Sequence, residues 1–301
     1  MKTRFVYFII ILFCFSCGGS SDNTALGKDI AALEKSTNEN ADLQALNDLQ
    51  NKYLEYYKEH PENREWAANY LRKGAYNAMQ SKNWPQAVGF FQTLLREYYD
   101  ENESQNDVED LISVFEKLNK PETTNNLKQI YVEAHPSSPL AAEYKKDLPE
   151  NALPMSEVIL NIGKQMFDDS LKTLIRTKAA QYVDACEALA LINPSHPEAP
   201  ELLYKAAETA KAMGSYPKAL TLYDWIIKRY PKYKNAPMAL FLKGFIFEND
   251  LKETEQAKQI YENFLEIYPD HEFADQTRFL LKHLGQSAEE ILKSISPDAE
   301  K

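Results

Sequence analysis

Apolar side chains recur along the chain with the spacing of an α-helix, and one arrangement of them occurs three times. The copies begin at Ala87, Ala219 and Ala257, and each places an aromatic residue at +4, two bulky apolar residues at +7 and +8, and Tyr at +11. Successive members of this set are three or four residues apart and therefore lie on one face of a helix. The pattern predicts three amphipathic helices of the same design.

Proline marks the ends of these helices. Pro231 and Pro269 directly follow the final Tyr of two copies, and Pro85 and Pro217 precede the first apolar residue of two copies. Proline is tolerated in the first turn of a helix, where its missing N–H group is not needed, and it cannot continue a helix beyond its end. Weaker copies, which bring the total to about six, end at His-Pro pairs that begin at His60, His135 and His196.

A further helix is expected before each strong copy, with a small residue at its centre. The small residue stands twelve or thirteen positions before the Ala of the copy that follows: Gly74, Ala207 and Gly244. Small residues at both centres allow the two helix backbones to approach closely. Neither helix can bury its apolar stripe alone, so the helix pairs are expected to stack on one another.

This arrangement resembles the tetratricopeptide repeat (TPR), a helix pair of 34 residues with small and aromatic residues at fixed offsets. The interval from Pro197 to Pro231 is 34 residues, and the next, to Pro269, is 38. The resemblance is good over 197–285, fair over 49–98 and poor over 100–195, and the signature Trp of the first helix is absent. It implies an all-α fold, a TPR-like α-solenoid of about five to six antiparallel helix pairs that forms a curved superhelix.

The first residues resemble a bacterial lipoprotein signal. Two basic residues precede an uninterrupted apolar run at 5–15, which is too short to cross a bilayer as a helix and fits the core of a signal peptide. Small residues follow, and cleavage before Cys17 would leave its thiol to carry the lipid. Cys14 stands where such signals usually have Leu. An ordinary secretory signal and an uncleaved anchor are the alternatives.

The composition indicates a folded, acidic protein. Apolar residues make up 44% of the 301 residues and charged residues 26%, and the net charge of −11 becomes −13 once residues 1–16, with their two basic side chains, are removed. An acidic protein is a poor partner for nucleic acid or anionic lipid. Besides Cys17, the mature part would hold only Cys186, which lies in a helical apolar pattern. A buried apolar role explains it better than a reactive thiol.

No motif of a known catalytic site occurs in the chain. There is no phosphate-binding G-x-x-x-x-G-K-[ST] loop, no G-x-G-x-x-G, no G-x-S-x-G and no H-E-x-x-H. Three of the five His residues precede Pro at helix ends, where a role at the helix C-terminus explains them better than a metal site. The sequence therefore predicts a protein that is not an enzyme and has no catalytic, cofactor-binding or metal-binding residues.

The order of polar and apolar segments predicts six parts. They are a lipoprotein signal peptide at 1–16, a lipidated Cys and polar tether at 17–40, an N-terminal TPR-like block at 41–135, a Pro-rich break at 136–154, a C-terminal TPR block at 155–285, and a capping helix and tail at 286–301.

In tetratricopeptide arrays the first helices of the pairs line a concave groove that holds partner proteins. The resemblance places in that groove the residue after the central Gly or Ala, the residue three before it, and residues one turn further on. The expected groove residues are Leu71, Ala75, Met79, Tyr204, Glu208, Lys211, Phe241, Phe245, Glu248 and Asn249. Packing of Phe241 and Phe245 on a neighbouring repeat is an equally weighted alternative for either residue.

Repeats that end in Tyr-Pro, on a lipoprotein, resemble the envelope repeat proteins of Gram-negative bacteria, among them BamD-type assembly lipoproteins and CpoB-type periplasmic proteins. The resemblance implies a scaffold anchored in the outer membrane and facing the periplasm, with envelope proteins or peptides as partners; exposure at the cell surface stays open. Assembly of outer-membrane proteins is the first hypothesis, and coordination of cell-wall synthesis and division is the second. A solute-binding lipoprotein of the SusD type is a third, although such receptors are considerably longer.

Overall fold

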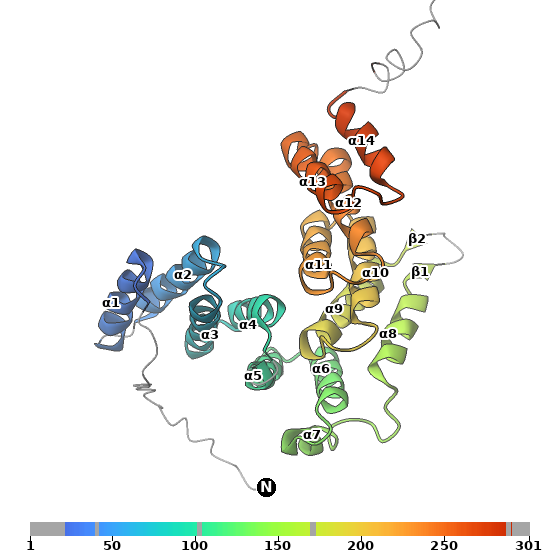
Figure 1. Ribbon diagram of the computed structural model, residues 1–301. Helices are drawn as coiled ribbons and strands as arrows, with labels where there is room; N and C mark the ends of the chain where they lie inside the picture. Colours follow the sequence, from blue (N-terminus) through green and yellow to red (C-terminus); the bar gives the residue numbers. More distant parts are fainter. Residues whose placement is uncertain (1–21, 40–41, 101–103, 169–172, 287–289, 291–301) are drawn as a thin grey trace, which may run out of the picture. The chain divides into compact units, whose positions relative to one another are not determined.

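The computed structural model describes residues 22–39, 42–100, 104–168, 173–286 and residue 290 (Figure 1). The described residues form fourteen α-helices, one π-helix and one two-stranded hairpin, so the expected all-α fold is confirmed. The predicted signal peptide, the lipidation site Cys17 and the start of the predicted C-terminal helix at Ser287 lie outside the described residues. Within them, none of the helices combines the length and the apolar character that crossing a bilayer requires.

The chain divides into two compact units, Met1–Ser81 and Lys82–Lys301. The division falls between two helices that the sequence pairs as one repeat. The Pro-rich segment 136–154, which was expected to separate two blocks, lies inside the second unit and contains the short helix α7 (Pro139–Tyr144). The two units are described separately below.

The first unit consists of α1 (Ala25–Glu39), α2 (Leu43–Glu59) and α3 (Arg64–Gln80). Its core is aromatic, because Tyr53 of α2 stacks on Tyr70 of α3 with ring centroids 5.5 Å apart, and Tyr56 meets the same ring edge-on at 4.7 Å. The polar ends of these rings lie against carboxylates: Tyr53 donates a hydrogen bond to Glu34 at 2.9 Å and Tyr70 donates one to Asp22 at 3.0 Å. Lys73 of α3 is also paired with Glu34 at 2.8 Å, so Glu34 joins α1 to both other helices, and Asp22 joins the segment before α1 to α3.

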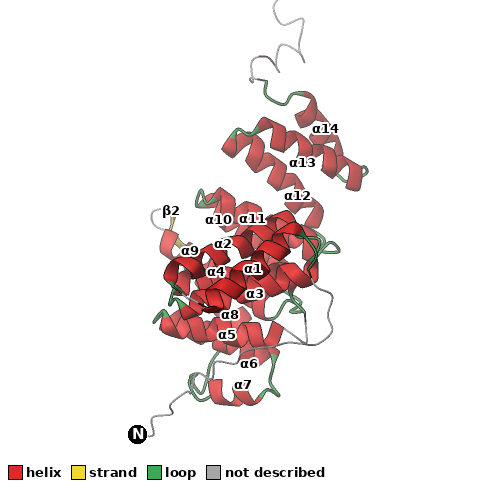
Figure 2. Cartoon of the chain, turned by 90° about the vertical axis from the view of Figure 1, so that its left-hand side faces the viewer, coloured by secondary structure: helices red, strands yellow, loops and turns green. Residues whose placement is uncertain are grey.

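The second unit continues the helix pairs. Its elements are α4 (Trp84–Tyr98), α5 (Ser104–Lys117), α6 (Pro121–Ala134), α7, α8 (Met155–Lys164), the hairpin β1 (Phe167–Asp168) and β2 (Thr173–Leu174), α9 (Arg176–Ile192), α10 (Ala199–Ala212), α11 (Tyr216–Arg229), α12 (Ala236–Phe245), the π-helix η1 (Ile246–Leu251), α13 (Thr254–Ile267) and α14 (Ala274–Lys282). From α9 to α14 each helix packs on the next in sequence, as expected of stacked repeats. Figure 2 shows that helices make up most of the described part of the chain.

The regular order is interrupted between α6 and α9. Helix α6 packs mainly on α9 rather than on α8, and the segment that contains α7 is folded back on α6. Lys128 of α6, whose side chain is nearly buried, forms ion pairs of 2.8 Å with Glu116 and with Asp147 and lies over the ring of Tyr144. This cation holds the Pro-rich segment against α6. The interruption accounts for the poor match of residues 100–195 to the repeat.

The three strong sequence copies form α4, α11 and α13, and their stripes are buried. The first Ala of each copy is fully buried, as are the aromatic residues four positions later: Phe91, Tyr223 and Tyr261. The two positions at +7 and +8 are buried or half-buried in all three. The predicted spacing is therefore the spacing of the core.

Gly244 of α12 is the place where a first helix and a second helix approach most closely in the last full repeat. A Cβ atom built on Gly244 would lie 2.6 Å from Cε1 of Tyr261 and 3.3 Å from Cγ2 of Ile260. The first distance is shorter than the contacts that real Cβ atoms make, and a buried ring between two helices cannot move aside freely. Glycine at this position is required by the close approach of α12 and α13.

The substitution Gly244→Leu is expected to destabilise the second unit by about 1–3 kcal/mol, because the added side chain forces Tyr261 out of its place in the core. Gly89 of α4 provides the control, since a Cβ atom there meets nothing within 4 Å. Gly89→Ala is expected to stabilise α4 by about 0.5–1 kcal/mol through helix propensity alone. Urea denaturation followed by circular dichroism measures both, and a Gly244→Leu protein as stable as the wild type would contradict the packing described.

Candidate partner-binding groove

A pocket opens between the first helices of two consecutive repeats in the second unit. Helix α10 forms one side, α12 and η1 form the other, and α11 closes the base. The pocket has a volume of about 420 Å³ and opens widely to solvent. Its lining residues, which define the α10–α12 pocket, are Glu208, Lys211, Ala212, Tyr223, Leu242 and Asp250.

The π-helix η1 shapes the far side of the pocket. It extends α12 by Ile246–Leu251 and ends at Lys252, which has a left-handed backbone with φ of 61°. The amide groups of Lys252 and Glu253 both donate to the carbonyl of Phe247, which closes the turn. π-helical turns occur frequently at functional sites because they redirect side chains at a helix end. Here the turn brings Asp250 to the edge of the pocket.

Lys211 of α10 reaches across the pocket to η1. Its Nζ atom lies 3.8 Å from Oδ2 of Asp250 and 4.8 Å from the centroid of the Phe245 ring. An ammonium group over an aromatic face is attracted by the ring electrons, and the carboxylate adds to this attraction. Lys211 therefore has two partners within the protein and joins the two sides of the pocket.

Tyr223 of α11 lies at the base of the pocket and is fully buried. Its ring meets the ring of Tyr204 edge-on, with centroids 6.1 Å apart. Among the described residues its hydroxyl group has no hydrogen-bond partner. Buried hydroxyl groups without a partner are uncommon in folded proteins, because leaving one unpaired costs free energy.

Tyrosines of the second helices elsewhere do have such partners. Tyr53 donates to Glu34 of α1 at 2.9 Å, Tyr131 of α6 donates to Glu109 of α5, and Tyr261 of α13 donates to Glu248 of η1 at 2.7 Å. In each pair a carboxylate of the first helix accepts the bond. The position of Glu248, four residues after the central Gly244, is occupied in the preceding repeat by Lys211, four residues after Ala207. An ammonium group cannot accept a hydrogen bond, so Tyr223 lacks this partner.

The rim of the pocket on α10 is acidic. Glu208 is exposed and forms no ion pair within the described residues. Partial burial and the negative charge of Glu201 raise the pKa of the Glu208 carboxyl above its ordinary value. Burial, and then the charges of Glu208 and Glu201, raise the pKa of Tyr204 to about 12. Glu201 is paired with Lys205 at 3.3 Å and accepts a hydrogen bond from Tyr233 at 2.7 Å, so Glu208 is the carboxylate of this face that has no ion pair within the described residues.

The structure brings several of the predicted groove residues together. Glu208 and Lys211 line the α10–α12 pocket, Phe245 lies under Lys211, and Tyr204 is half-buried against Tyr223. Glu248 and Asn249 lie on η1, where Glu248 accepts the bond from Tyr261 and Asn249 donates weakly to the carbonyl of Phe245 at 3.3 Å. Met79, which is half-buried, lies on α3 in the first unit.

Three predicted groove residues are buried and require correction. Phe241 is 4% exposed and packs on Tyr261, Phe264 and Phe273, so it belongs to the core of the last repeat. Leu71 and Ala75 are fully buried. The physical reason is helix rotation: at Leu71 and Phe241, three before the central Gly, and at Ala75, directly after it, the side chain is turned into the core rather than toward solvent.

Sequence analysis missed two residues of the pocket. Asp250 is not among the expected groove residues, because a π-turn cannot be recognised from one sequence. Tyr223 was assigned to the core, which is correct for its ring but leaves its hydroxyl group unexplained. A signal was present, since Lys211 stands where the next repeat has the carboxylate of Glu248.

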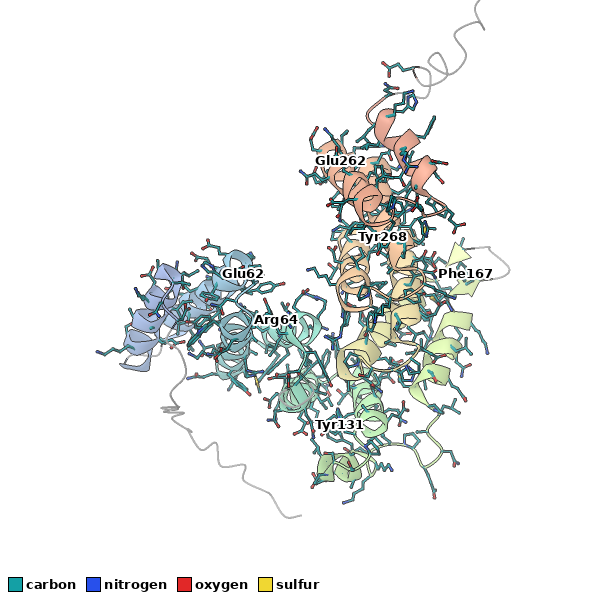
Figure 3. All side chains as sticks on the ribbon, viewed as in Figure 1. Glu62, Arg64, Tyr131, Phe167, Glu262 and Tyr268 are labelled. Atoms are coloured by element: carbon teal, nitrogen blue, oxygen red, sulfur yellow. The ribbon has the colours of Figure 1, made fainter. Side chains whose placement is uncertain are left out.

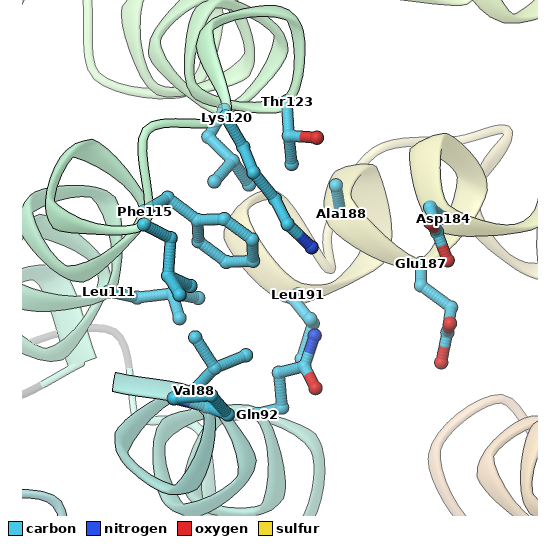
Figure 4. Close-up of a pocket in the computed structure, with 13 residues that line it drawn as sticks. Val88, Gln92, Leu111, Phe115, Lys120, Thr123, Asp184, Glu187, Ala188 and Leu191 are labelled. Atoms are coloured by element: carbon cyan, nitrogen blue, oxygen red, sulfur yellow. The ribbon is translucent and has the colours of Figure 1, made fainter. Parts of the chain in front are cut away.

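A second cavity, of about 290 Å³, lies among α4, α5, α6 and α9 (Figure 4). Val88, Leu111 and Phe115 form an apolar wall, and Lys120 extends its amino group into the space. Glu187, which is almost buried on the opposite side, is paired with Lys218 at 2.9 Å. Unlike the α10–α12 pocket, this cavity is not lined by any of the buried polar atoms that lack a partner among the described residues.

The comparisons with known proteins agree with the repeat assignment in this region. The sequence of the tetratricopeptide repeat family matches residues 201–233 and 238–271. No curated protein matches the chain. A solved structure of the TPR2AB domain in a pHSP90 complex of yeast Sti1 is similar at 14% sequence identity, covers 85% of this chain and 91% of its own, and has a TM-score of 0.32.

The matched residues comprise most of α10 and α11 in one repeat and most of α12 to α13 in the next. The α10–α12 pocket lies between these two repeats, on their first helices. The chain therefore contains tetratricopeptide repeats at 201–233 and 238–271, and its fold is a TPR-like array of helix pairs.

Proposed function

We propose that this protein is a non-catalytic scaffold that binds a partner protein in the α10–α12 pocket. The observation that carries the proposal is the pocket itself. It lies between the first helices of two tetratricopeptide repeats, and one of its lining residues, Tyr223, has a buried hydroxyl group with no partner in the described part of the chain. Repeats of this kind present the first helices of successive pairs to extended peptides or partner helices. Aromatic residues at its edge, Tyr204 and Phe245, supply the apolar contact area that such interfaces use.

The proposed setting is the envelope of a Gram-negative bacterium, with the protein anchored through Cys17 to the outer membrane and facing the periplasm. The support is the N-terminal sequence, in which a short apolar run is followed by small residues around Cys17. Assembly of outer-membrane proteins, as for BamD-type lipoproteins, is the function that we place first. Coordination of cell-wall synthesis and division is the alternative with the same anchor and the same groove.

The test is site-specific photo-crosslinking in the native envelope. Ala212 is exposed and lines the α10–α12 pocket, so a photoreactive amino acid placed there would contact a partner directly. Glu262, on α13 and exposed, is the matched control outside the pocket (Figure 3). We expect crosslinks from position 212 to subunits of the barrel-assembly machinery, identified by mass spectrometry, and none of these from position 262.

Different outcomes choose between the alternatives. Crosslinks from position 212 to cell-wall synthases or division proteins would replace the first function with the second. The same set of products from both positions would mean that the pocket is not the binding surface, and no product from position 212 under conditions that label position 262 would overturn the proposal.

A further inference from the structure

Two residues that line the α10–α12 pocket have a buried polar atom with no hydrogen-bond partner among the described residues: the hydroxyl oxygen of Tyr223 and Oδ2 of Asp250. Tyr223, whose side chain is fully buried, is one of the residues that line the pocket, and Oδ2 of Asp250 lies 3.8 Å from the Nζ atom of Lys211. Glu208, at the rim of the same pocket, forms no ion pair within the described residues. An unpaired buried hydroxyl group costs free energy, so a ligand that donates a hydrogen bond to Tyr223 gains from the pairing. The exposed carboxylate of Glu208 at the rim can pair with a positive charge on the same ligand.

The charges around the pocket favour a cation over an anion. Burial and then the charge of Glu201 raise the pKa of Glu208, while Lys205 lowers it. Glu201 is paired with Lys205 at 3.3 Å and with Lys234 at 3.9 Å, whereas Glu208 forms no ion pair within the described residues. A positive group placed between Glu208 and the pocket would pair with the one carboxylate of this face that has no ion pair within the described residues. The cation of the pocket, Lys211, is already engaged with Asp250 and with the ring of Phe245, so an incoming anion would have to compete with these contacts.

The hydroxyl group of Tyr223 suits the same ligand. Burial, followed by the proximity of Tyr204 and Glu208, raises the pKa of Tyr223. The group therefore stays neutral at physiological pH, and its oxygen can accept a hydrogen bond from an ammonium or guanidinium group. The ring of Tyr223 and the side chain of Leu242 provide apolar surface for the methylene groups of such a side chain.

We propose that the α10–α12 pocket binds a lysine or arginine side chain of the partner protein, with Glu208 pairing with its charge and the Tyr223 hydroxyl oxygen accepting a hydrogen bond from it. This inference rests on the proposed function, since it names the chemistry that the scaffold recognises in its partner. It also agrees with the net charge of −11, because a basic segment is attracted to an acidic protein.

The test uses the purified mature protein and three labelled heptapeptides, which differ only at a central residue flanked by leucines. The central residue is lysine, norleucine or glutamate, and binding is followed by fluorescence anisotropy. We expect saturable binding of the lysine peptide, with an affinity at least about tenfold higher than that of the other two peptides. A hydrogen-bonded charge pair contributes enough free energy for a difference of this size. Because the partner protein is absent, this experiment can fail while the crosslinking result still supports the scaffold.

Two variants assign the binding to the named groups. Glu208→Gln is expected to lower the affinity for the lysine peptide about tenfold. Tyr223→Phe is expected to lower it about three- to tenfold, since this variant removes one hydrogen bond to a charged group. Glu262→Gln removes an equal charge from the exposed face of α13 and is expected to leave binding unchanged.

Thermal unfolding shows whether the tyrosine effect is one of binding or of folding. Tyr223→Phe loses no hydrogen bond within the described residues and is expected to melt at or above the wild-type temperature. Its matched control, Tyr261→Phe, loses the bond to Glu248 and is expected to melt below it. Equal affinity for the lysine and norleucine peptides, tighter binding of the glutamate peptide, or unchanged binding in both Glu208→Gln and Tyr223→Phe would overturn the proposal.

Discussion

Replacing Tyr261 by Ala is expected to lower the free energy of unfolding of the second unit by about 3–5 kcal/mol. The ring is fully buried between α12 and α13, with Phe241 at 6.0 Å between centroids and Gly244 directly beneath it. Its loss leaves a cavity in the core of the last repeat and removes the hydrogen bond to Glu248. Urea denaturation followed by the helical circular dichroism signal measures the change.

The variant Tyr261→Phe separates the two contributions. It keeps the ring and removes the hydrogen bond, so it is expected to cost only about 0.5–1.5 kcal/mol. If Tyr261→Ala unfolds at the same urea concentration as the wild type, the assignment of this position to the core of the repeat is wrong, and with it the alignment that places Tyr223 at the equivalent position.

Replacing Cys17 by Ser is expected to move the protein from the membrane fraction to the soluble or unprocessed fraction. Each buried methylene group of an attached acyl chain contributes about 0.8 kcal/mol to the free energy of membrane binding, so two or more acyl chains hold a protein stably on a bilayer. The Ser variant has no thiol to carry these acyl chains and therefore lacks this anchor. Fractionation of cells by ultracentrifugation, together with labelling by radioactive fatty acid, measures the effect.

The control for this substitution is Cys186→Ala. Cys186 is fully buried in α9 and burial raises the pKa of its thiol, so it is not a site of acylation. This variant is expected to pellet and to label as the wild type does. A Cys17→Ser protein that still takes up fatty acid would show that the lipid is attached elsewhere.

The fold could be predicted from the sequence because the same residue types recur at the same helical spacing in each repeat. Ala at the start of a stripe, an aromatic residue one turn later and Pro after the last Tyr define a helix, its buried face and its end, and Ala219, Tyr223 and Pro231 each occupy the predicted place. The interruption between α6 and α9 could not be predicted, since it depends on ion pairs of Lys128 with residues distant in the sequence.

The groove could be predicted only in part. The apolar stripe of a helix gives the position of each residue along it. A rotation of the helix by one residue decides whether a side chain faces the core or solvent, and an error of this size in the predicted rotation placed Phe241 in the groove. Asp250 depends on a π-turn, whose hydrogen bonds leave no regular pattern in the sequence. The unpaired hydroxyl group of Tyr223 could be inferred only by comparing two repeats. Tyr261 occupies the equivalent position in the next repeat and donates to Glu248, whereas the repeat of Tyr223 has Lys211 in place of that carboxylate.

The buried tyrosines that join the helix pairs also determine how the fold responds to alkali. Burial raises the pKa of Tyr204 and of Tyr230 to about 12, and raises those of Tyr223 and Tyr261 further, whereas tyrosine in an unfolded chain ionises near about 10. Below about pH 10 neither state has released these protons, so their contribution to stability is complete. Above it the unfolded chain alone releases them, and stability falls as the pH rises through the folded pKa values. Each of these rings makes the loss of stability in alkali steeper, so the aromatic side chains that hold the repeats together also make the fold sensitive to high pH.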